Sequence, residues 1–272
     1  MLLIVASLLG TGVAAAGDDS SSWDGDARSA VRLLAAAPAG KSSTVRAGVE
    51  VRLMRGWHTY WRYPGDAGVP PRFDFAKSSN VKSVSVLWPA PQPIPEQGLV
   101  AIGYVRDVLW PLEIVPENPG KPVTLRLKLD YAVCEKLCVP AEGKAELTVK
   151  SGSASNDAAL AAALARVPKK VALGEGSPLA IRAVRREGGG AQGRVIVDVA
   201  APAGADVALF AEGPAPDWAL PVPTAVEGAP AGLRRFAFDL DGAPPGAKYD
   251  GAAITLTAVA GEHAIELTTR LD

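Results

Sequence analysis

Apolar and polar side chains alternate along several short runs of this chain, and this alternation limits the fold more than any other feature. From 45 to 53 the odd positions are apolar, whereas Arg46, Glu50 and Arg52 fall on even positions. Six further runs alternate in the same way: 84–88, 108–114, 123–133, 195–199, 236–240 and 263–267. Successive side chains of a β-strand point to opposite faces, so each run predicts a strand with one buried face.

Turn-forming residues separate these runs. The chain has 28 glycines and 23 prolines, which favours many short strands joined by turns and predicts a mainly β protein. Its 272 residues, 48% of them apolar, suffice for two cores. Between the two groups of runs, apolar residues over 160–167 have helical spacing, and Pro168 ends the pattern. We therefore predict two antiparallel β-sandwich domains, 24–150 and 173–272, joined by a short helical linker over 151–172.

The first residues of the chain resemble an export signal. Residues 1–16 are apolar or small and end in three alanines, a pattern that a signal peptidase could cleave before Gly17. No Lys or Arg precedes the apolar run, and the alternative is a buried N-terminal strand. The run is shorter than the ~20 residues that a helix needs to cross a bilayer. We expect a signal peptide over 1–16 and an exported, soluble mature protein.

The charge balance argues against one class of partner. The chain has 28 basic and 29 acidic side chains and no long run of one sign. Such a protein has no overall field to attract the phosphates of nucleic acid. We expect no nucleic acid among its partners.

The only two cysteines, Cys134 and Cys138, directly follow the longest alternating run. If 135–137 form a three-residue turn, the two side chains lie opposite each other on neighbouring strands, within reach of a disulfide. Closing so small a loop stabilises the fold by only about 2 kcal/mol, which favours thiol-disulfide exchange over a purely structural bond. An inert disulfide and a two-thiolate Cu(I) site stay open, whereas zinc lacks ligands nearby in the sequence. No metal and no organic cofactor is expected.

Strand parity suggests which sulfur is accessible. Leu127, Leu129 and Val133 take the buried face of their run, so Cys134 should point to the outer face. Cys138 directly precedes Val139-Pro140 and is expected to be the more sheltered cysteine. We therefore expect a partner thiolate to attack Cys134.

Four motifs together resemble the N-terminal domain of the DsbD and ScsB family of disulfide reductases. They lie within about 45–149, in the order found in that family: 56–68 (GWHTYWRYPGDAG), 87–91 (LWPAP), 103–104 (GY) and 133–140 (VCEKLCVP). The resemblance implies an immunoglobulin-like sandwich in the bacterial periplasm. It also implies that the pair Cys134 and Cys138 is catalytic, that a membrane-embedded electron donor reduces it, and that thioredoxin-like periplasmic proteins, including those of cytochrome c biogenesis, receive the electrons.

Two features differ from the family pattern. Full-length members continue into transmembrane helices and a thioredoxin-like domain, whereas this sequence ends at Asp272 after a second β domain of the kind that ScsB-type members carry. In the best-known members an aromatic cap loop shields the cysteines, with acidic residues nearby. The corresponding stretch here is 99–104, in which Tyr104 is the available aromatic residue and no acid is present.

The aromatic motif also has a reading from strand parity alone. Trp57, Thr59 and Trp61 continue the odd-position face of their strand, so both tryptophans are expected in the core. His58 and Tyr60 then face outward. His58 could assist the thiol chemistry if the fold brings it near Cys134, or it could be a hydrogen-bonded structural histidine. We also expect Arg62 and Asp66 to pair.

Three functions fit these residues. The first is a thiol-disulfide oxidoreductase that relays reducing equivalents through Cys134 and Cys138. The second is a non-catalytic binding or copper-handling module with a structural disulfide. The third is an adhesin-like structural protein built from two sandwiches. The first hypothesis predicts a readily reducible disulfide, and the other two do not.

Overall fold

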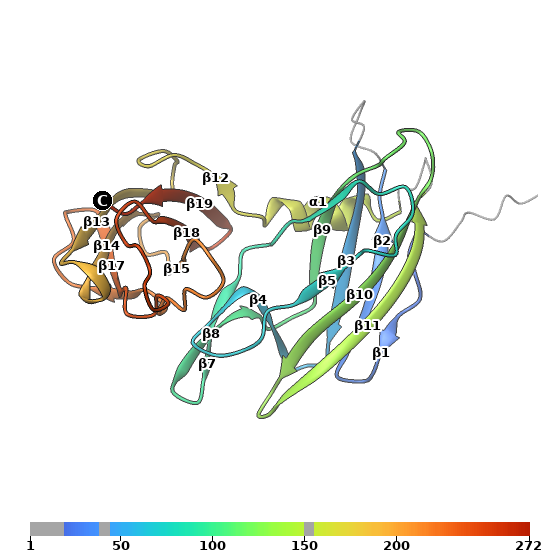
Figure 1. Ribbon diagram of the computed structural model, residues 1–272, viewed down its shortest axis with the longest axis horizontal. Helices are drawn as coiled ribbons and strands as arrows, with labels where there is room; N and C mark the ends of the chain where they lie inside the picture. Colours follow the sequence, from blue (N-terminus) through green and yellow to red (C-terminus); the bar gives the residue numbers. More distant parts are fainter. Residues whose placement is uncertain (1–18, 38–43, 150–154) are drawn as a thin grey trace, which may run out of the picture.

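The computed structural model describes residues 19–37, 44–149 and 155–272, which form two β-sandwiches (Figure 1). The predicted mainly β fold with two immunoglobulin-like sandwiches is confirmed. The predicted signal peptide over 1–16 lies outside the described residues. Within the described ranges, no helix has both the length and the apolar character needed to cross a membrane.

The N-terminal sandwich consists of two antiparallel sheets. The first has the order β1-β2-β3-β9-β6, with the bounds Asp24–Gly25, Ser29–Ala35, Val45–Leu53, Val108–Val115 and Ser83–Val86. The second has the order β11-β10-β4-β8-β7, with β5 also paired to β10; its strands span Cys138–Val149, Val123–Cys134, His58–Gly65, Leu99–Tyr104, Gln92–Glu96 and Arg72–Asp74.

Alternate side chains of facing strands fill the space between these sheets, as the sequence pattern predicts. Val49 and Val51 of β3 and Trp110 of β9 face Leu125 and Leu129 of β10, and all five are fully buried. Burial of such apolar side chains is the main source of stability for a sandwich of this kind. The strand pair β10 and β11 carries the cysteines at its turn end.

A helix follows β11 and packs on the N-terminal sandwich. This helix, α1, spans Asp157–Ala165 and lies beside β9 in Figure 1. Its Leu160 is buried against Leu34, and the side-chain amide of Asn156 donates hydrogen bonds to backbone oxygens of Asp19 and Ala35. The helix is therefore fastened to the first sandwich and is not a free tether.

The chain enters the second sandwich earlier than the sequence suggests. Strand β12, Lys169–Lys170, pairs in parallel with β19. Both lysines fall in the predicted linker, but their backbone hydrogen bonds make them part of the second sandwich. The short apolar pattern around them could not reveal this, because a two-residue strand has no recognisable alternation.

The second sandwich also has two sheets. One has the order β12-β19-β18-β15 and the other β13-β14-β17-β16. The remaining strands span Ala180–Glu187 (β13), Arg194–Ala200 (β14), Val207–Glu212 (β15), Thr224–Val226 (β16), Leu233–Asp239 (β17), Ala253–Ala260 (β18) and His263–Arg270 (β19), and a short 3₁₀ turn, η1, spans Gly190–Gln192. Val197, Phe236, Leu256 and Leu267 are among the residues of its separate core.

Side chains of β4 in the first sandwich form hydrogen bonds to the second sandwich. The guanidinium of Arg62 donates hydrogen bonds to Glu212 on β15 and to Glu266 on β19, at 2.6 and 2.5 Å. The hydroxyl of Tyr63 donates to the backbone oxygen of Leu220. The expected pair of Arg62 with Asp66 is wrong: Asp66 instead accepts a hydrogen bond from a backbone N–H of β8, because Arg62 finds two carboxylates across the interface.

Candidate functional site

Cys134 and Cys138 form a disulfide at the end of the long hairpin, as predicted from their spacing. Cys134 is the last residue of β10 and Cys138 the first of β11, and the two are directly paired in register. Three residues, Glu135–Leu137, form the turn between them. The Cα atoms are 4.1 Å apart, somewhat closer than the ~4.5 Å of a non-hydrogen-bonded pair of opposed residues in antiparallel strands.

The two sulfurs differ sharply in exposure, in the opposite sense to the expectation. Cys134 is completely buried, whereas Cys138 is exposed. Strand parity does place Cys134 on the outer face of its sheet. That face is covered at this end of the sandwich, where Tyr60, Ile94 and Ala101 pack around Cys134. Cys138 is therefore the sulfur that a partner thiolate can reach.

Tyr60 on β4 contacts both sulfurs. Its hydroxyl oxygen lies 2.7 Å from Cys134 Sγ and 3.2 Å from Cys138 Sγ. Neither sulfur of a disulfide carries a proton, so the hydroxyl is the donor in this state. Burial, helped by the Glu96 carboxylate, raises the pKa of Tyr60 to about 12, so the hydroxyl keeps its proton.

A glycine allows the loop after β4 to lie on the Tyr60 ring. Gly68 has a φ of +111°, and a Cβ atom there would lie 2.2 Å from the ring carbon Cε1 of Tyr60. Any other residue would be strained and would push the ring away from the sulfurs. The tyrosine is thus held in place between this loop and the disulfide.

Glu96 on β7 is the acidic residue of the site, and it lies outside the stretch 99–104 that was expected to cover the cysteines. Its Oε1 lies 3.4 Å from Cys138 Sγ. The stretch 99–104, predicted to cover the cysteines, lacks an acid, but the covering hairpin begins on β7 and includes Glu96. Gln97 and Gly98 both have positive φ, as in a two-residue hairpin turn. That Gln-Gly pair is the sequence feature that could have placed Glu96 in the hairpin.

His58 lies beside Cys134, to which it is directly paired across β4 and β10. It is on the predicted outer face but only 6% exposed. Burial lowers the pKa of His58, although the Glu96 carboxylate acts in the opposite direction. Its Nε2 is 3.7 Å from Glu96 Oε2, which is within ion-pair range but too long for a hydrogen bond. Among the described residues, neither of these two buried atoms has a hydrogen-bond partner.

Tyr104 does not shield the cysteines. Its ring lies in the main core of the N-terminal sandwich against Trp110, and its hydroxyl donates a hydrogen bond to the backbone oxygen of Pro89 at 2.9 Å. The side chain therefore points to the inner face of the sheet, away from the outer-face cluster of Cys134. The aromatic side chain at the disulfide is that of Tyr60.

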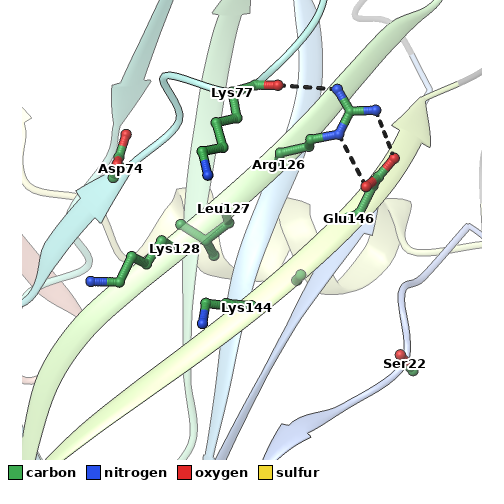
Figure 2. Close-up of a pocket in the computed structure, with 9 residues that line it drawn as sticks. Ser22, Asp74, Lys77, Arg126, Leu127, Lys128, Lys144 and Glu146 are labelled. Atoms are coloured by element: carbon green, nitrogen blue, oxygen red, sulfur yellow. Dashed lines mark hydrogen bonds and ion pairs between the residues drawn. The ribbon is translucent and has the colours of Figure 1, made fainter.

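Two cavities are relevant to the position of the site. One of about 410 Å³ is lined by His58 and Glu96, which lie beside the cysteines, and by Val105 and Glu135, among others. A second of about 450 Å³, shown in Figure 2, lies over the middle of β10 and β11, where Arg126 pairs with Glu146. Neither cysteine lines either cavity, and most of the charged groups of the second cavity are already paired. The first cavity is thus the one whose lining includes residues that lie beside the cysteines, His58 and Glu96.

Comparison with known proteins agrees with this geometry. Residues 30–150 match the family model described as "Thiol:disulfide interchange protein DsbD, N-terminal". The fold resembles the crystal structure of the N-terminal periplasmic domain of ScsB from Proteus mirabilis, with a TM-score of 0.73 and 19% sequence identity. The similarity covers 93% of this chain and 98% of the ScsB chain, so it includes both sandwiches. No curated protein sequence matches the chain. The segment 30–150, with the disulfide and the residues around it, belongs to the family of DsbD N-terminal domains.

Proposed function

We propose that this protein is a periplasmic thiol-disulfide oxidoreductase that relays reducing equivalents through Cys134 and Cys138. In this proposal a membrane-embedded donor reduces the disulfide, and thioredoxin-like periplasmic proteins, those of cytochrome c biogenesis included, receive the electrons. Membership of 30–150 in the DsbD N-terminal family supports the exchange chemistry. The similarity to a periplasmic domain of ScsB supports the compartment.

The observation that carries this proposal is the unequal exposure of the two sulfurs. During electron uptake, a donor thiolate attacks exposed Cys138 Sγ, the Cys134–Cys138 bond breaks, and Cys134 leaves as a thiolate. The Tyr60 hydroxyl stabilises this leaving group by donating to Cys134 Sγ. A second thiol of the donor then attacks the donor sulfur of this mixed disulfide, which frees Cys138 and leaves the donor with a disulfide of its own. In total two electrons and two protons enter the pair.

Electron delivery follows the same path in the other direction. Cys138 loses its proton, for which the Glu96 carboxylate is an acceptor, with Oε1 at 3.4 Å from Cys138 Sγ. The Cys138 thiolate attacks the disulfide of the recipient and forms a mixed disulfide. Cys134 then attacks Cys138 Sγ, which releases the recipient as a dithiol and restores the Cys134–Cys138 bond. Buried Cys134 takes part only as the resolving thiol.

An apolar side chain at the tip of the hairpin offers a docking contact for such partners. Leu137, between the two cysteines, is 76% exposed, and Val105 beside the adjoining cavity is 39% exposed. Large exposed hydrophobic residues next to a reactive group are typical of contacts with protein partners. A protein partner would bury Leu137, whereas a small dithiol would not need it.

The proposal is tested by the rate at which the disulfide reacts with reduced thioredoxin and by its reduction potential. We expect reaction with thioredoxin and a potential above about −300 mV, which is the range of exchange-active pairs. Leu137→Ser should slow the reaction with thioredoxin and leave the reaction with dithiothreitol unchanged. A potential below −300 mV, with resistance to reduced thioredoxin, would show that the bond is structural.

A further inference from the structure

The disulfide site contains three potential metal ligands that the proposed exchange reaction does not fully use. The ligand atoms of His58, Glu96 and Cys134 all lie within 4.8 Å of one another. His58 Nε2 and Glu96 Oε2 are buried and have no hydrogen-bond partner in the described part of the chain. Unpartnered buried polar atoms are costly, so two of them side by side indicate that something else binds there.

Reduction of the disulfide would add a fourth ligand. Cys138 Sγ already lies 3.4 Å from Glu96 Oε1, on the same carboxylate that faces His58. The reduced site therefore offers two thiolates, one imidazole and one carboxylate. Zinc prefers four ligands of these kinds in a tetrahedron. The sequence argues against zinc because the histidines are remote from the cysteines along the chain, but β4 brings His58 directly beside Cys134.

The distances agree with a tetrahedral site after a small movement. With Zn–S bonds of about 2.3 Å, two thiolates on one tetrahedral ion lie about 3.8 Å apart. Reduction breaks the Cys134–Cys138 bond, so the two sulfurs are then free to move apart to this separation. Exposed Cys138 can make most of this movement, because it adjoins the solvent-exposed turn of the hairpin.

We propose that the reduced protein binds one Zn²⁺ ion through Cys134, Cys138, His58 and Glu96. A dithiol reductant supplies two electrons and two protons to the disulfide and itself becomes a disulfide. Zn²⁺ then displaces both thiol protons and binds the two thiolates. Only the reduced state can form the site. Bound zinc occupies the lone pairs with which Cys138 would attack a partner, so zinc holds the pair reduced and inactive. This inference goes beyond the proposed function and requires only that the bond can be reduced.

The experiment is a zinc titration of the full chain against a chromophoric chelator. Protein reduced with dithiothreitol, then freed of it, should bind one equivalent of zinc, and the oxidised protein should bind at least about 100-fold more weakly. His58→Ala and Glu96→Gln should each weaken binding by at least about tenfold, since even outer-shell changes have effects of this size. Matched controls are His263→Ala and Glu135→Gln, which remove a histidine and a carboxylate outside the cluster.

Cobalt substitution reports the ligand set independently of affinity. Co²⁺ in the reduced protein should show the intense visible bands of a tetrahedral site and thiolate-to-cobalt charge transfer. His58→Ala should shift the visible bands, and Cys134→Ala should weaken the charge transfer. Glu96→Gln provides the test if His58→Ala fails to fold, because Glu96 is partly exposed.

Three results would overturn the inference: no zinc binding by the reduced protein, equal affinity in the His58 and Glu96 variants, or binding of Cu(I) alone. A Cu(I) site needs only the two thiolates, so it would be insensitive to both variants. The thioredoxin reaction is measured without metal. A failure of zinc binding is thus distinct from a failure of the exchange function.

Discussion

Each sandwich holds a carboxylate away from solvent, and the two carboxylates have very different surroundings. Asp198 in the second sandwich has a side chain that is 2% exposed. It accepts hydrogen bonds from Arg235 at 2.7 and 3.0 Å and from Arg185 at 3.2 Å. Glu96 in the first sandwich is 17% exposed, faces a histidine across 3.7 Å and leaves Oε2 without a hydrogen bond.

This difference separates a structural cluster from a reactive one. Hydrogen bonds from Arg235 hold the pKa of Asp198 below its usual value, and both oxygens of that carboxylate have hydrogen-bond partners. The Glu96 cluster instead leaves polar atoms unsatisfied beside a disulfide. Polar networks that stabilise a fold are normally complete, whereas incomplete ones beside a nucleophile are typical of functional sites. We therefore expect substitutions in the Asp198 cluster to change mainly the free energy of unfolding, and substitutions in the Glu96 cluster to change mainly the reactions of the cysteines.

The largest stability effect is expected from Arg235→Met. It leaves the buried Asp198 carboxylate with only the more exposed Arg185 as partner, and should lower the free energy of unfolding by about 2–4 kcal/mol. Denaturant unfolding of the variant measures this. Arg234→Met, on the opposite face of the same strand, is the matched control. An equal loss in both variants, or any change in the exchange rate, would break the comparison.

Replacing both Cys134 and Cys138 by alanine should lower stability by no more than about 2–3 kcal/mol. The disulfide closes a loop of only five residues, so it restricts the unfolded chain little, and some packing around buried Cys134 is lost in addition. Thermal and denaturant unfolding give the value. A double variant that does not fold would show that the bond is structural, and the contrast between the two sandwiches would then no longer hold.

Tyr60→Phe should slow reduction by thioredoxin about tenfold, because the leaving thiolate of Cys134 loses a hydrogen bond worth about 1.5 kcal/mol. Stopped-flow kinetics measure the rate. Tyr131→Phe is a matched control, since it removes a buried hydroxyl hydrogen-bonded at 2.8 Å to Ser29 and not to sulfur. If both variants react at the wild-type rate, Tyr60 only fills space.

The smallest effect on stability is expected from Glu96→Gln. The amide has the shape of the carboxylate but carries no charge, and the carboxylate has no cationic partner except the weakly placed His58. Stability should therefore stay the same or rise by up to about 1 kcal/mol. Denaturant unfolding checks it. A loss as large as that of Arg235→Met would mean that Glu96 belongs to a structural network like that of Asp198.

The periodicity of the sequence predicts the strands well and the environment of the site poorly. The run 123–133 correctly gives β10 and the side of the sheet on which Cys134 lies, because alternation is a property of the strand alone. Whether that side is covered depends on the β7–β8 hairpin and on the loop at Gly68, which are distant in sequence. For this reason the expectation of Tyr104 at the cysteines is wrong, and the positions of Tyr60 and Glu96 beside the sulfurs do not follow from the sequence pattern.

The same limit explains why the expectation that Cys134 is the more exposed cysteine is wrong. Strand parity indicates that Cys134 faces outward, but it gives no sign that Tyr60 and Ile94 cover this residue. The ion pairs of Arg62 with Glu212 and Glu266 were also out of reach, because they join residues 150 and 204 positions apart. Local pairing rules carry no information on such contacts.

The most direct test of the account compares the single variants Cys134→Ala and Cys138→Ala, each expressed in the periplasm with a thioredoxin-like partner. Cys134→Ala keeps the exposed sulfur and lacks the resolving one, so it should accumulate a covalent complex that runs as a higher-mass band on non-reducing gels and disappears on reduction. Cys138→Ala keeps only the buried sulfur and should accumulate little or none. Equal trapping by both variants, or trapping by Cys138→Ala alone, would contradict the assignment of Cys138 as the reactive sulfur.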